Sequence, residues 1–336
     1  MTNATAPLLE VEHLTKHYPV RAGLLSRARA EVHAVDDVSF IIAEGETLGL
    51  VGESGCGKST LGRTVLKLTD ATSGSIRWRG ERIDGLAARA MRPYRRELQA
   101  VFQDPYASLN PRLRAADIVA EPIRNFEGGR QADVRDRVAW LFGKVGLRPD
   151  QLAKYPYEFS GGQRQRLGIA RALAPQPRLI VCDEPVSALD VSVQAQVINL
   201  LVDLQREFRL SYLFVAHDLA VVEHISHRVA VMYLGRIVEL AATRELFDQP
   251  QHPYTEALLS AVPVPDPKAT RKRIILAGDV PSPIHLPTGC RFHTRCPYVF
   301  DRCRVEEPRL LEIAPGHLAA CHLREPAAVP VTFTRH

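Results

Sequence analysis

The sequence predicts an α/β fold on a mostly parallel sheet, with an inserted α-helical subdomain and a small cysteine-rich unit near the C-terminal end. Three short apolar runs, at residues 47–51, 179–182 and 212–216, are continuous rather than alternating, as expected for strands covered on both faces. Helical patterns such as residues 193–208 separate these runs, which favours alternating strands and helices. Four of the six cysteines lie within residues 290–321.

The composition is that of a globular protein. The chain has 336 residues, of which 46% are hydrophobic and 24% charged, so it can bury a large core. The net charge of +5 permits contact with anionic lipid or nucleotide phosphate, but it does not predict a nucleic-acid partner. The first residues lack a signal-peptide pattern, and no run approaches the roughly 20 apolar residues of a spanning helix. We therefore expect a cytosolic chain, or one attached to a membrane only through partners.

Two changes of character divide the chain. Between about residues 105 and 165 the sequence is charged, poor in strand signals and periodic, for example at 134–142, which predicts the inserted helical subdomain. Prolines become frequent over residues 262–268 and indicate a linker. We expect a main domain over residues 1–260 and a C-terminal region over residues 261–336. The chain shows no internal repeat, so we expect one main domain rather than a tandem pair.

A phosphate-binding loop follows the first predicted strand. Residues 52–60 (GESGCGKST) fit G-x-x-x-x-G-K-[ST] between this strand and a predicted helix over 61–68, and this context disfavours an accidental glycine turn. Successive backbone N–H groups and the helix start would bind phosphate. Lys58 adds a charge for the β- and γ-phosphates, and Ser59 offers a hydroxyl to Mg²⁺. The ATP-binding residues expected here are Gly52, Glu53, Ser54, Gly55, Cys56, Gly57, Lys58, Ser59 and Thr60.

Two adjacent acids, Asp183 and Glu184, end the second apolar run. Side chains alternate along a strand, so the two carboxylates are expected to act separately. Asp183 suits the Mg²⁺ shell, and Glu184 is then free to polarise the attacking water. Such a pair alone is more often a turn or a helix start, and it gains meaning from the phosphate loop. His217 ends the third run beside the same pocket and can contact the γ-phosphate, whereas His224 is expected to be structural, as is His227.

Residues 159–166 (FSGGQRQR) resemble the signature sequence of ABC ATPases, with Phe159 where leucine is common. Further family elements stand in the expected order. Tyr18 matches the aromatic residue that stacks on adenine, and Gln103 matches the glutamine at the join to the helical subdomain. Residues 187–190 match the loop after the paired acids, and His217 matches the switch histidine. A tyrosine after a short strand is also common in a core or on a surface, so Tyr18 has this alternative. The resemblance covers about residues 8–260.

The resemblance implies a P-loop (RecA-like) ABC ATPase core, with ATP and Mg²⁺ as cofactors. The residues it implies for catalysis are Glu184, His217 and Gln103. The residues it implies for Mg²⁺ binding are Ser59, Gln103 and Asp183. Those implied for contact with the ATP of a second cassette are Ser160, Gly161, Gly162 and Gln163.

The signature residues form a second glycine-rich anion site at a predicted helix start. This site lies across the inserted subdomain from Lys58, so one chain cannot bring both to one ATP. Head-to-tail pairing of two cassettes solves this, and nucleotide then favours the closed pair until hydrolysis releases it. Gln103 and residues 104–110 are expected to face membrane partners.

Other segments resemble the oligopeptide/dipeptide importer branch of the family, and they are residues 103–112, 233–239, 252–263 and 289–303 together with Pro308, His317 and Cys321. This extends the resemblance to about residue 325. It implies ATP-driven import of di- or oligopeptides by a peripheral subunit on the cytoplasmic face of the inner membrane. The implied partners are a second, related ATPase subunit, two transmembrane permeases and an extracytoplasmic binding protein. Relatives also handle murein fragments and nickel chelates, so the cargo stays open.

Four cysteines near the end of the chain, Cys290, Cys296, Cys303 and Cys321, have the spacing C-x5-C-x6-C-x17-C. In a reducing cytosol such a cluster more often binds metal than forms disulfides. Four thiolates can hold zinc or an iron–sulfur cluster, and the absence of C-x2-C pairs favours the latter. Four packed cysteines without metal remain the alternative. The family resemblance implies a [4Fe–4S] cluster that staples a unit too small for its own core.

Two other classes of protein fit the sequence less well than a transport ATPase. Soluble ABC ATPases of translation or DNA repair usually carry two cassettes or a long coiled coil, and neither is present. A metal-stabilised nucleic-acid module would show a basic stripe. The basic segment at residues 21–29 is expected to be a solvated loop between two strands, with contact to anionic lipid as the alternative.

Overall fold

The computed structural model describes residues 7–20, 30–262 and 274–325. The basic segment at residues 21–29 lies outside these ranges, as does most of the proline-rich linker. Within the described ranges, none of the helices combines the length and apolar character that a bilayer crossing requires.

The central sheet has eight strands in the order β11-β12-β10-β9-β3-β8-β7-β6. Its middle is parallel, and every residue of β3, β7 and β8 is buried. These three strands confirm the prediction from the apolar runs. Parallel strands align their carboxyl ends, so the loops that follow them meet along one edge. The parallel strands are β3 (Thr47–Val51), β6 (Leu98–Val101), β7 (Leu179–Asp183), β8 (Ser211–Val215) and β9 (Arg228–Tyr233).

A second, antiparallel sheet has the order β2-β1-β4-β5. The pairing of β1 with β2 contains several register shifts, and both strands mix buried and exposed residues. A separate apolar core lies between this sheet, helix α1 (Lys58–Val65) and one face of the central sheet. The strands are β1 (Leu9–Val20), β2 (Ala30–Ile42), β4 (Ser73–Trp78) and β5 (Glu81–Arg82).

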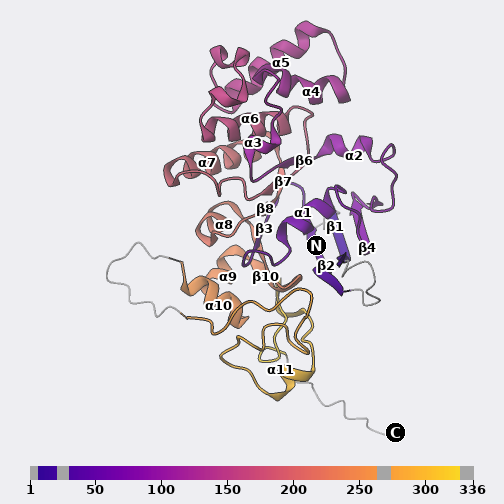
Figure 1. Ribbon diagram of the computed structural model, residues 1–336, viewed down its shortest axis with the longest axis vertical. Helices are drawn as coiled ribbons and strands as arrows, with labels where there is room; N and C mark the ends of the chain where they lie inside the picture. The colour runs from indigo at the N-terminus through magenta and orange to yellow at the C-terminus, as the bar shows by residue number, and fades with distance from the viewer. Residues whose placement is uncertain (1–6, 21–29, 263–273, 326–336) are drawn as a thin grey trace.

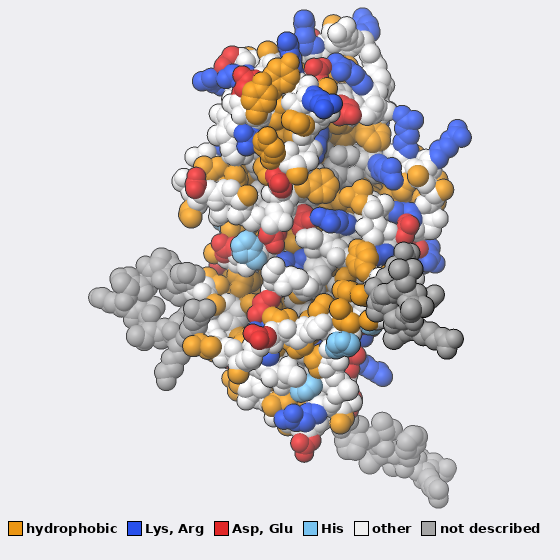
Figure 2. Space-filling view, in the orientation of Figure 1, with side chains coloured by type: hydrophobic (Ala, Val, Ile, Leu, Met, Phe, Trp, Pro, Cys, Tyr) orange, Lys and Arg blue, Asp and Glu red, His pale blue; other side chains and the backbone are white. Residues whose placement is uncertain are grey.

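Helices occupy the chain between β6 and β7 and lie at one end of the molecule (Figure 1). Helix α6 packs against α3, α4, α5, α7 and β6. Basic side chains project from this end and are mixed with acidic and apolar ones on the face in Figure 2. The elements are α3 (Pro105–Ser108), α4 (Ala115–Phe126), α5 (Gln131–Lys144), η1 (Pro149–Ala153), η2 (Pro156–Glu158) and α6 (Gly161–Leu173), with α2 (Arg92–Glu97) before β6.

The cysteine-rich unit lies at the opposite end of the molecule (Figure 1). Its strand β12 pairs with β10, so the last part of the chain extends the central sheet. The remaining helices are α7 (Val191–Phe208), α8 (Leu219–Ile225), α9 (Thr243–Asp248), α10 (Pro253–Ser260) and α11 (Asp301–Val305), and the remaining strands are β10 (Arg236–Ala242), β11 (Leu311–Ala314) and β12 (His317–Ala319).

Candidate functional site

The phosphate loop joins β3 to α1, which begins three residues earlier than predicted and ends at Val65. Two of its glycines have backbone angles and neighbours that exclude a side chain. Gly52 has φ 153°, and a Cβ there would lie 2.2 Å from the carbonyl oxygen of Met232. Gly57 has φ 109°, and a Cβ there would lie 1.9 Å from the carbonyl oxygen of Ala34. The loop can therefore pass close to the neighbouring backbone only with glycine at these positions.

Lys58 is buried within the loop that it follows. Its side-chain amine donates hydrogen bonds to the backbone oxygens of Gly52 at 2.7 Å and Glu53 at 3.0 Å. The residue is only 4% exposed. The cation is thus held in place by neutral carbonyl groups, which a phosphate oxygen can replace. This arrangement fits the predicted role of Lys58 toward the β- and γ-phosphates.

Ser59 and Asp183 meet although 124 positions separate them. The hydroxyl of Ser59 donates to Oδ1 of Asp183 at 2.6 Å. Asp183 is the last residue of β7 and is buried. A hydroxyl and a carboxylate oxygen are the ligand types that Mg²⁺ accepts beside nucleotide phosphates. The structure therefore brings together two of the three predicted Mg²⁺ ligands, Ser59 and Asp183.

Glu184 lies one residue beyond Asp183 and makes separate contacts. Its Oε2 accepts from Nε2 of Gln103 at 3.1 Å and lies 3.4 Å from Nδ1 of His217. Its backbone has φ 47°, in the left-handed region, and its N–H bonds to the carbonyl oxygen of Val215 at 3.0 Å. Left-handed backbone at a residue other than glycine is costly and is concentrated at functional sites. The three predicted catalytic residues are thus neighbours.

The signature residues begin α6. Ser160 is its N-cap and forms a capping box, in which the hydroxyl accepts from the N–H of Gln163 at 3.3 Å and Oε1 of Gln163 accepts from the N–H of Ser160 at 3.1 Å. A Cβ at Gly162 would lie 2.4 Å from Cγ1 of Val193, so glycine allows α6 to approach α7. Ser160 and Gly161 are exposed. They are open to a group supplied by another molecule.

Tyr18 lies inside β1, whereas the sequence places it after a short strand. The strand is longer than expected and continues past Tyr18 to Val20, with register shifts in its pairing with β2. Tyr18 is 37% exposed, and the amine of Lys16 lies 4.7 Å from the centroid of its ring. An exposed aromatic face is compatible with stacking on a base, and the neighbouring cation adds favourable electrostatics for a nucleotide.

The four C-terminal cysteines lie near one another. Cys303 and Cys321 are buried, and Cys290 and Cys296 are half buried. Burial raises the pKa of Cys290 to about 12, and neighbouring cysteines add to this rise because like charges repel. Backbone N–H groups two positions along the chain donate to the sulfurs of Cys290, Cys296 and Cys321, which favours the thiolate that binds metal.

The spacing of these sulfurs bears on the kind of centre. Within the described residues, no three cysteine sulfurs lie within 4.8 Å of one another, and the group that meets this limit is His17, His33 and Asp36. A zinc tetrahedron with Zn–S of about 2.3 Å requires sulfurs roughly 3.8 Å apart. The arrangement of the described cysteines does not match a preformed zinc tetrahedron. In the histidine group, Asp36 already pairs with Arg291.

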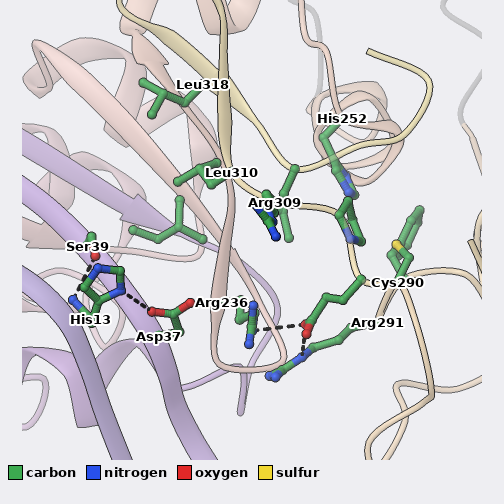
Figure 3. Close-up of a pocket in the computed structure, with 16 residues that line it drawn as sticks. His13, Asp37, Ser39, Arg236, His252, Cys290, Arg291, Arg309, Leu310 and Leu318 are labelled. Atoms are coloured by element: carbon green, nitrogen blue, oxygen red, sulfur yellow. Dashed lines mark hydrogen bonds and ion pairs between the residues drawn. The ribbon is translucent and has the colours of Figure 1, made fainter. Parts of the chain in front are cut away.

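Two cavities lie in different parts of the molecule. A small one of about 30 Å³ is lined by residues that include Glu184, Ser187 and His217. A larger one of about 510 Å³ lies between β2, β10 and the cysteine-rich unit, and Arg236 and Arg291 converge beside it (Figure 3). Glu184 and His217, two of the three predicted catalytic residues, line the small cavity, and none of the three lines the large one.

Sequence reasoning missed two residues that contact the phosphate loop. Tyr254 and Arg295 both bind Glu53. They lie 201 and 242 positions away from it. The sequence offers one indication for Arg295, because this residue directly precedes Cys296 in the segment expected to bind metal.

A phosphate loop between a strand and a helix, a hydroxyl–carboxylate pair for Mg²⁺ and an adjacent glutamate define a P-loop nucleotide hydrolase. Two family profiles narrow this class: "ABC transporter" matches residues 35–187, and "Oligopeptide/dipeptide transporter, C-terminal region" matches residues 238–303. The chain belongs to the ABC transporter family, as one of its ATP-hydrolysing subunits. Both matches confirm the resemblance found in the sequence.

Two curated relatives are similar over nearly the whole chain. The "Probable peptide ABC transporter ATP-binding protein y4tS" of Sinorhizobium fredii is 57% identical over 321 residues, covering 96% of this chain and 91% of that protein. The "Oligopeptide transport ATP-binding protein AppF" of Bacillus subtilis is 52% identical over 319 residues, covering 94% and 97%.

Solved structures confirm the predicted ABC ATPase core. The ATP-binding cassette MJ0796, in a dimeric post-hydrolysis state bound to ADP and Pi, gives a TM-score of 0.63 at 28% identity, over 70% of this chain and 99% of that one. The cbiO1 protein from Clostridium perfringens, part of the ABC transporter complex cbiONQ, gives a TM-score of 0.63 at 26% identity, over 73% and 92%.

Proposed function

We propose that this chain powers the import of di- or oligopeptides across the cytoplasmic membrane, on whose inner face it is held by membrane-spanning permeases. The observation that carries this proposal is the extent of similarity to the two peptide-transport relatives, which continues through the C-terminal region. An extracytoplasmic binding protein would deliver the cargo.

The ATP site supports a division of labour among its residues. Lys58 and the loop N–H groups bind the phosphates, and Ser59 and Asp183 hold Mg²⁺, which neutralises charge on the phosphate oxygens. Glu184 orients and polarises the attacking water. Gln103 fixes the glutamate through its 3.1 Å hydrogen bond, and His217 stands beside it to contact the γ-phosphate.

A second, related cassette subunit completes each ATP site in this proposal. Support comes from the exposed signature turn at Ser160 and Gly161. Helix α6 lies in the helical end, away from α1 and the phosphate loop (Figure 1). In a head-to-tail pair, the capped start of α6 of one chain would face the phosphates bound by Lys58 of the other.

The division into domains is also part of the proposal. The elements from α3 to α6 are helical, which supports a helical subdomain over about residues 105–165 within a nucleotide-binding domain over residues 1–260. The family profile for the C-terminal region begins at residue 238, and β12 pairs with β10. The C-terminal region over residues 261–336 would therefore depend on the main sheet for its position.

Cys290, Cys296, Cys303 and Cys321 are proposed to hold a [4Fe–4S] cluster with a stapling role. Their proximity and their N–H donors support a metal centre, and the lack of any three sulfurs within 4.8 Å of one another among the described residues favours an iron–sulfur cluster over zinc. Protein purified without oxygen should contain about four iron and four sulfide ions per chain and absorb broadly in the visible range. One zinc ion per chain, or no metal, would contradict the proposal.

The cargo is tested by transport in membrane vesicles that contain the complete transporter. Vesicles supplied with ATP should accumulate labelled di- and tripeptides, and vesicles carrying the Glu184→Gln variant of this chain should not. Accumulation of a nickel chelate or a murein peptide instead would assign a different cargo to the same machinery. Hydrolysis of ATP without any association of the chain with membranes would favour a soluble ABC ATPase.

A further inference from the structure

The cysteine-rich unit reaches the phosphate loop through Arg295. Its Nη1 donates to Oε2 of Glu53 at 2.7 Å, and its Nη2 donates to Oε1 at 3.1 Å. The guanidinium and the carboxylate therefore meet at two points, which fixes both distance and orientation. The side chain of Arg295 is 8% exposed, and that of Glu53 is 28% exposed. Because the pair is partly shielded from water, solvent screening weakens it less than it weakens an exposed ion pair.

Tyr254 holds the backbone of the same residue. The N–H of Glu53 donates to the hydroxyl of Tyr254 at 2.8 Å. Tyr254 is fully buried in α10, and its ring packs 5.4 Å from that of Phe292 in the cysteine-rich unit. Tyr254 therefore binds the backbone of Glu53, and Arg295 binds its side chain.

Arg291 fixes the segment that carries Arg295. Its side chain is buried, and it pairs with Asp36 on β2 and with Glu307. Figure 3 shows Arg291 and Arg236 converging at the cavity of about 510 Å³. There Arg291 binds Glu307 at 3.2 Å and Arg236 binds it at 3.1 Å. The segment between Cys290 and Cys296 is therefore anchored to the body of the protein, and Arg295 extends from a fixed base.

These contacts lead to the residue that binds phosphate. The backbone oxygen of Glu53 accepts a hydrogen bond from the amine of Lys58 at 3.0 Å. Arg295, Glu53 and Lys58 form a continuous chain of contacts from the cysteine-rich unit to the phosphate site. A loop that is already in its binding conformation loses less conformational freedom when ATP arrives, and this strengthens binding.

We propose that Arg295 is a positioning residue for ATP binding, through which the folded cysteine-rich unit holds the phosphate loop in its binding conformation. This inference rests on the ATP site described above. It assigns the C-terminal region a role in ATP affinity beyond holding the polypeptide together. Loss of the unit's internal structure would then weaken ATP binding without any change in the loop sequence.

Equilibrium binding of Mg·ATP to the full chain tests the pair. Arg295→Gln and Glu53→Gln should each weaken binding about 10-fold, equal to about 1.4 kcal/mol. The double variant should bind no more weakly than either single one, because residues that act only through each other are not additive. In hydrolysis assays on the assembled transporter, KM should rise about 10-fold with kcat changed less than twofold. Arg295→Lys should recover part of the affinity.

Arg302→Gln is the matched control. Like Arg295, Arg302 directly precedes one of the four proposed cluster ligands, Cys303. Arg302 pairs with Glu306 and Glu325. Its substitution should leave ATP affinity unchanged. Glu53→Gln leaves the cysteine-rich unit intact, so it tests the proposal even if Arg295→Gln fails to fold. Wild-type affinity in Glu53→Gln, fully additive losses, or an equal loss in Arg302→Gln would overturn the proposal. Failure of the wild-type chain to bind ATP would instead contradict the ATP site itself.

Discussion

The hydroxyl of Ser59 lies 2.6 Å from Oδ1 of Asp183 and donates to it. This bond connects the start of α1, the helix that follows β3, with the end of β7. In the sheet β8 lies between β3 and β7. Because the strands are parallel, the residues after β3 and β7 emerge at the same edge. The pair is therefore placed by topology as well as by side-chain chemistry.

Ser59→Ala should weaken the use of Mg·ATP. The variant removes a hydroxyl that is expected to bind Mg²⁺, so KM for Mg·ATP should rise about 10-fold, with a larger Mg²⁺ requirement. Ser59→Thr keeps the hydroxyl and should retain most activity. Steady-state hydrolysis at varied Mg²⁺ measures both. An unchanged Mg²⁺ requirement in Ser59→Ala would show that this hydroxyl is not a ligand.

Glu184→Gln should separate binding from hydrolysis. The amide keeps the size of the side chain but cannot polarise water, so ATP should bind and stabilise the cassette pair while hydrolysis falls at least about 100-fold. Rapid gel filtration with ATP and phosphate release assays measure the two properties. Normal hydrolysis would rule out the assignment of Glu184 as the residue that positions water.

Ser160→Arg should block the pair without harming the chain's own ATP site. Ser160 is exposed at the start of α6, and a bulky cation there would obstruct a facing nucleotide. ATP affinity of the separate chain should change less than twofold, and ATP-dependent pairing and hydrolysis should be lost. The contrary result is a chain that stays monomeric with ATP and still hydrolyses it at the full rate.

Gly57→Ala should disrupt the phosphate loop. The new methyl would lie 1.9 Å from the carbonyl oxygen of Ala34 and would sit on a backbone with φ 109°. We expect loss of ATP binding and a destabilisation of more than about 2 kcal/mol. Gly55→Ala is the control, because Gly55 has φ 80° and nothing within 4 Å of the added methyl. It should lose only about 1–2 kcal/mol. Denaturation and ATP titration compare the two, and equal losses would refute the steric explanation.

Stability should fall between pH 6.5 and 4 because of His252. Burial lowers the pKa of His252 to about 4, and its neutral Nδ1 accepts from the N–H of Tyr254 at 3.1 Å. In this range the unfolded chain binds a proton that the folded chain does not, which costs up to about 1.4 kcal/mol per pH unit. His252→Asn keeps an acceptor without titrating. Thermal unfolding at pH 7 and pH 5 should show a smaller drop for the variant, and equal drops would contradict this assignment.

Three of the parallel strands, β3, β7 and β8, and the clustering of the residues that follow them were predictable because their signals are local. β3, β7 and β8 are continuous apolar runs. The phosphate loop follows β3, Asp183 and Glu184 lie at the end of β7, and His217 lies just after β8. The antiparallel sheet was not foreseen as a unit, since β1 and β2 are half exposed and their pairing is interrupted by register shifts. Alternation of buried and exposed residues is then too irregular to indicate a strand.

The contacts of Glu53 lay beyond sequence reasoning for a different reason. Its partners are 201 and 242 positions away, and only the packed structure reveals which arginine of the cysteine-rich unit approaches it. The pattern of cysteines showed where a metal centre could form. It could not show that Arg295 points from this unit toward the ATP site.

The pairing of β12 with β10 limits how the gene can be shortened. A chain that stops near residue 262 would keep every motif of the hydrolytic site but would leave the outer edge of β10 without its partner. Uncovered strand edges recruit other chains. Such a fragment should precipitate or self-associate, so crystallographers and enzymologists who want a minimal soluble cassette should retain residues through at least Glu325.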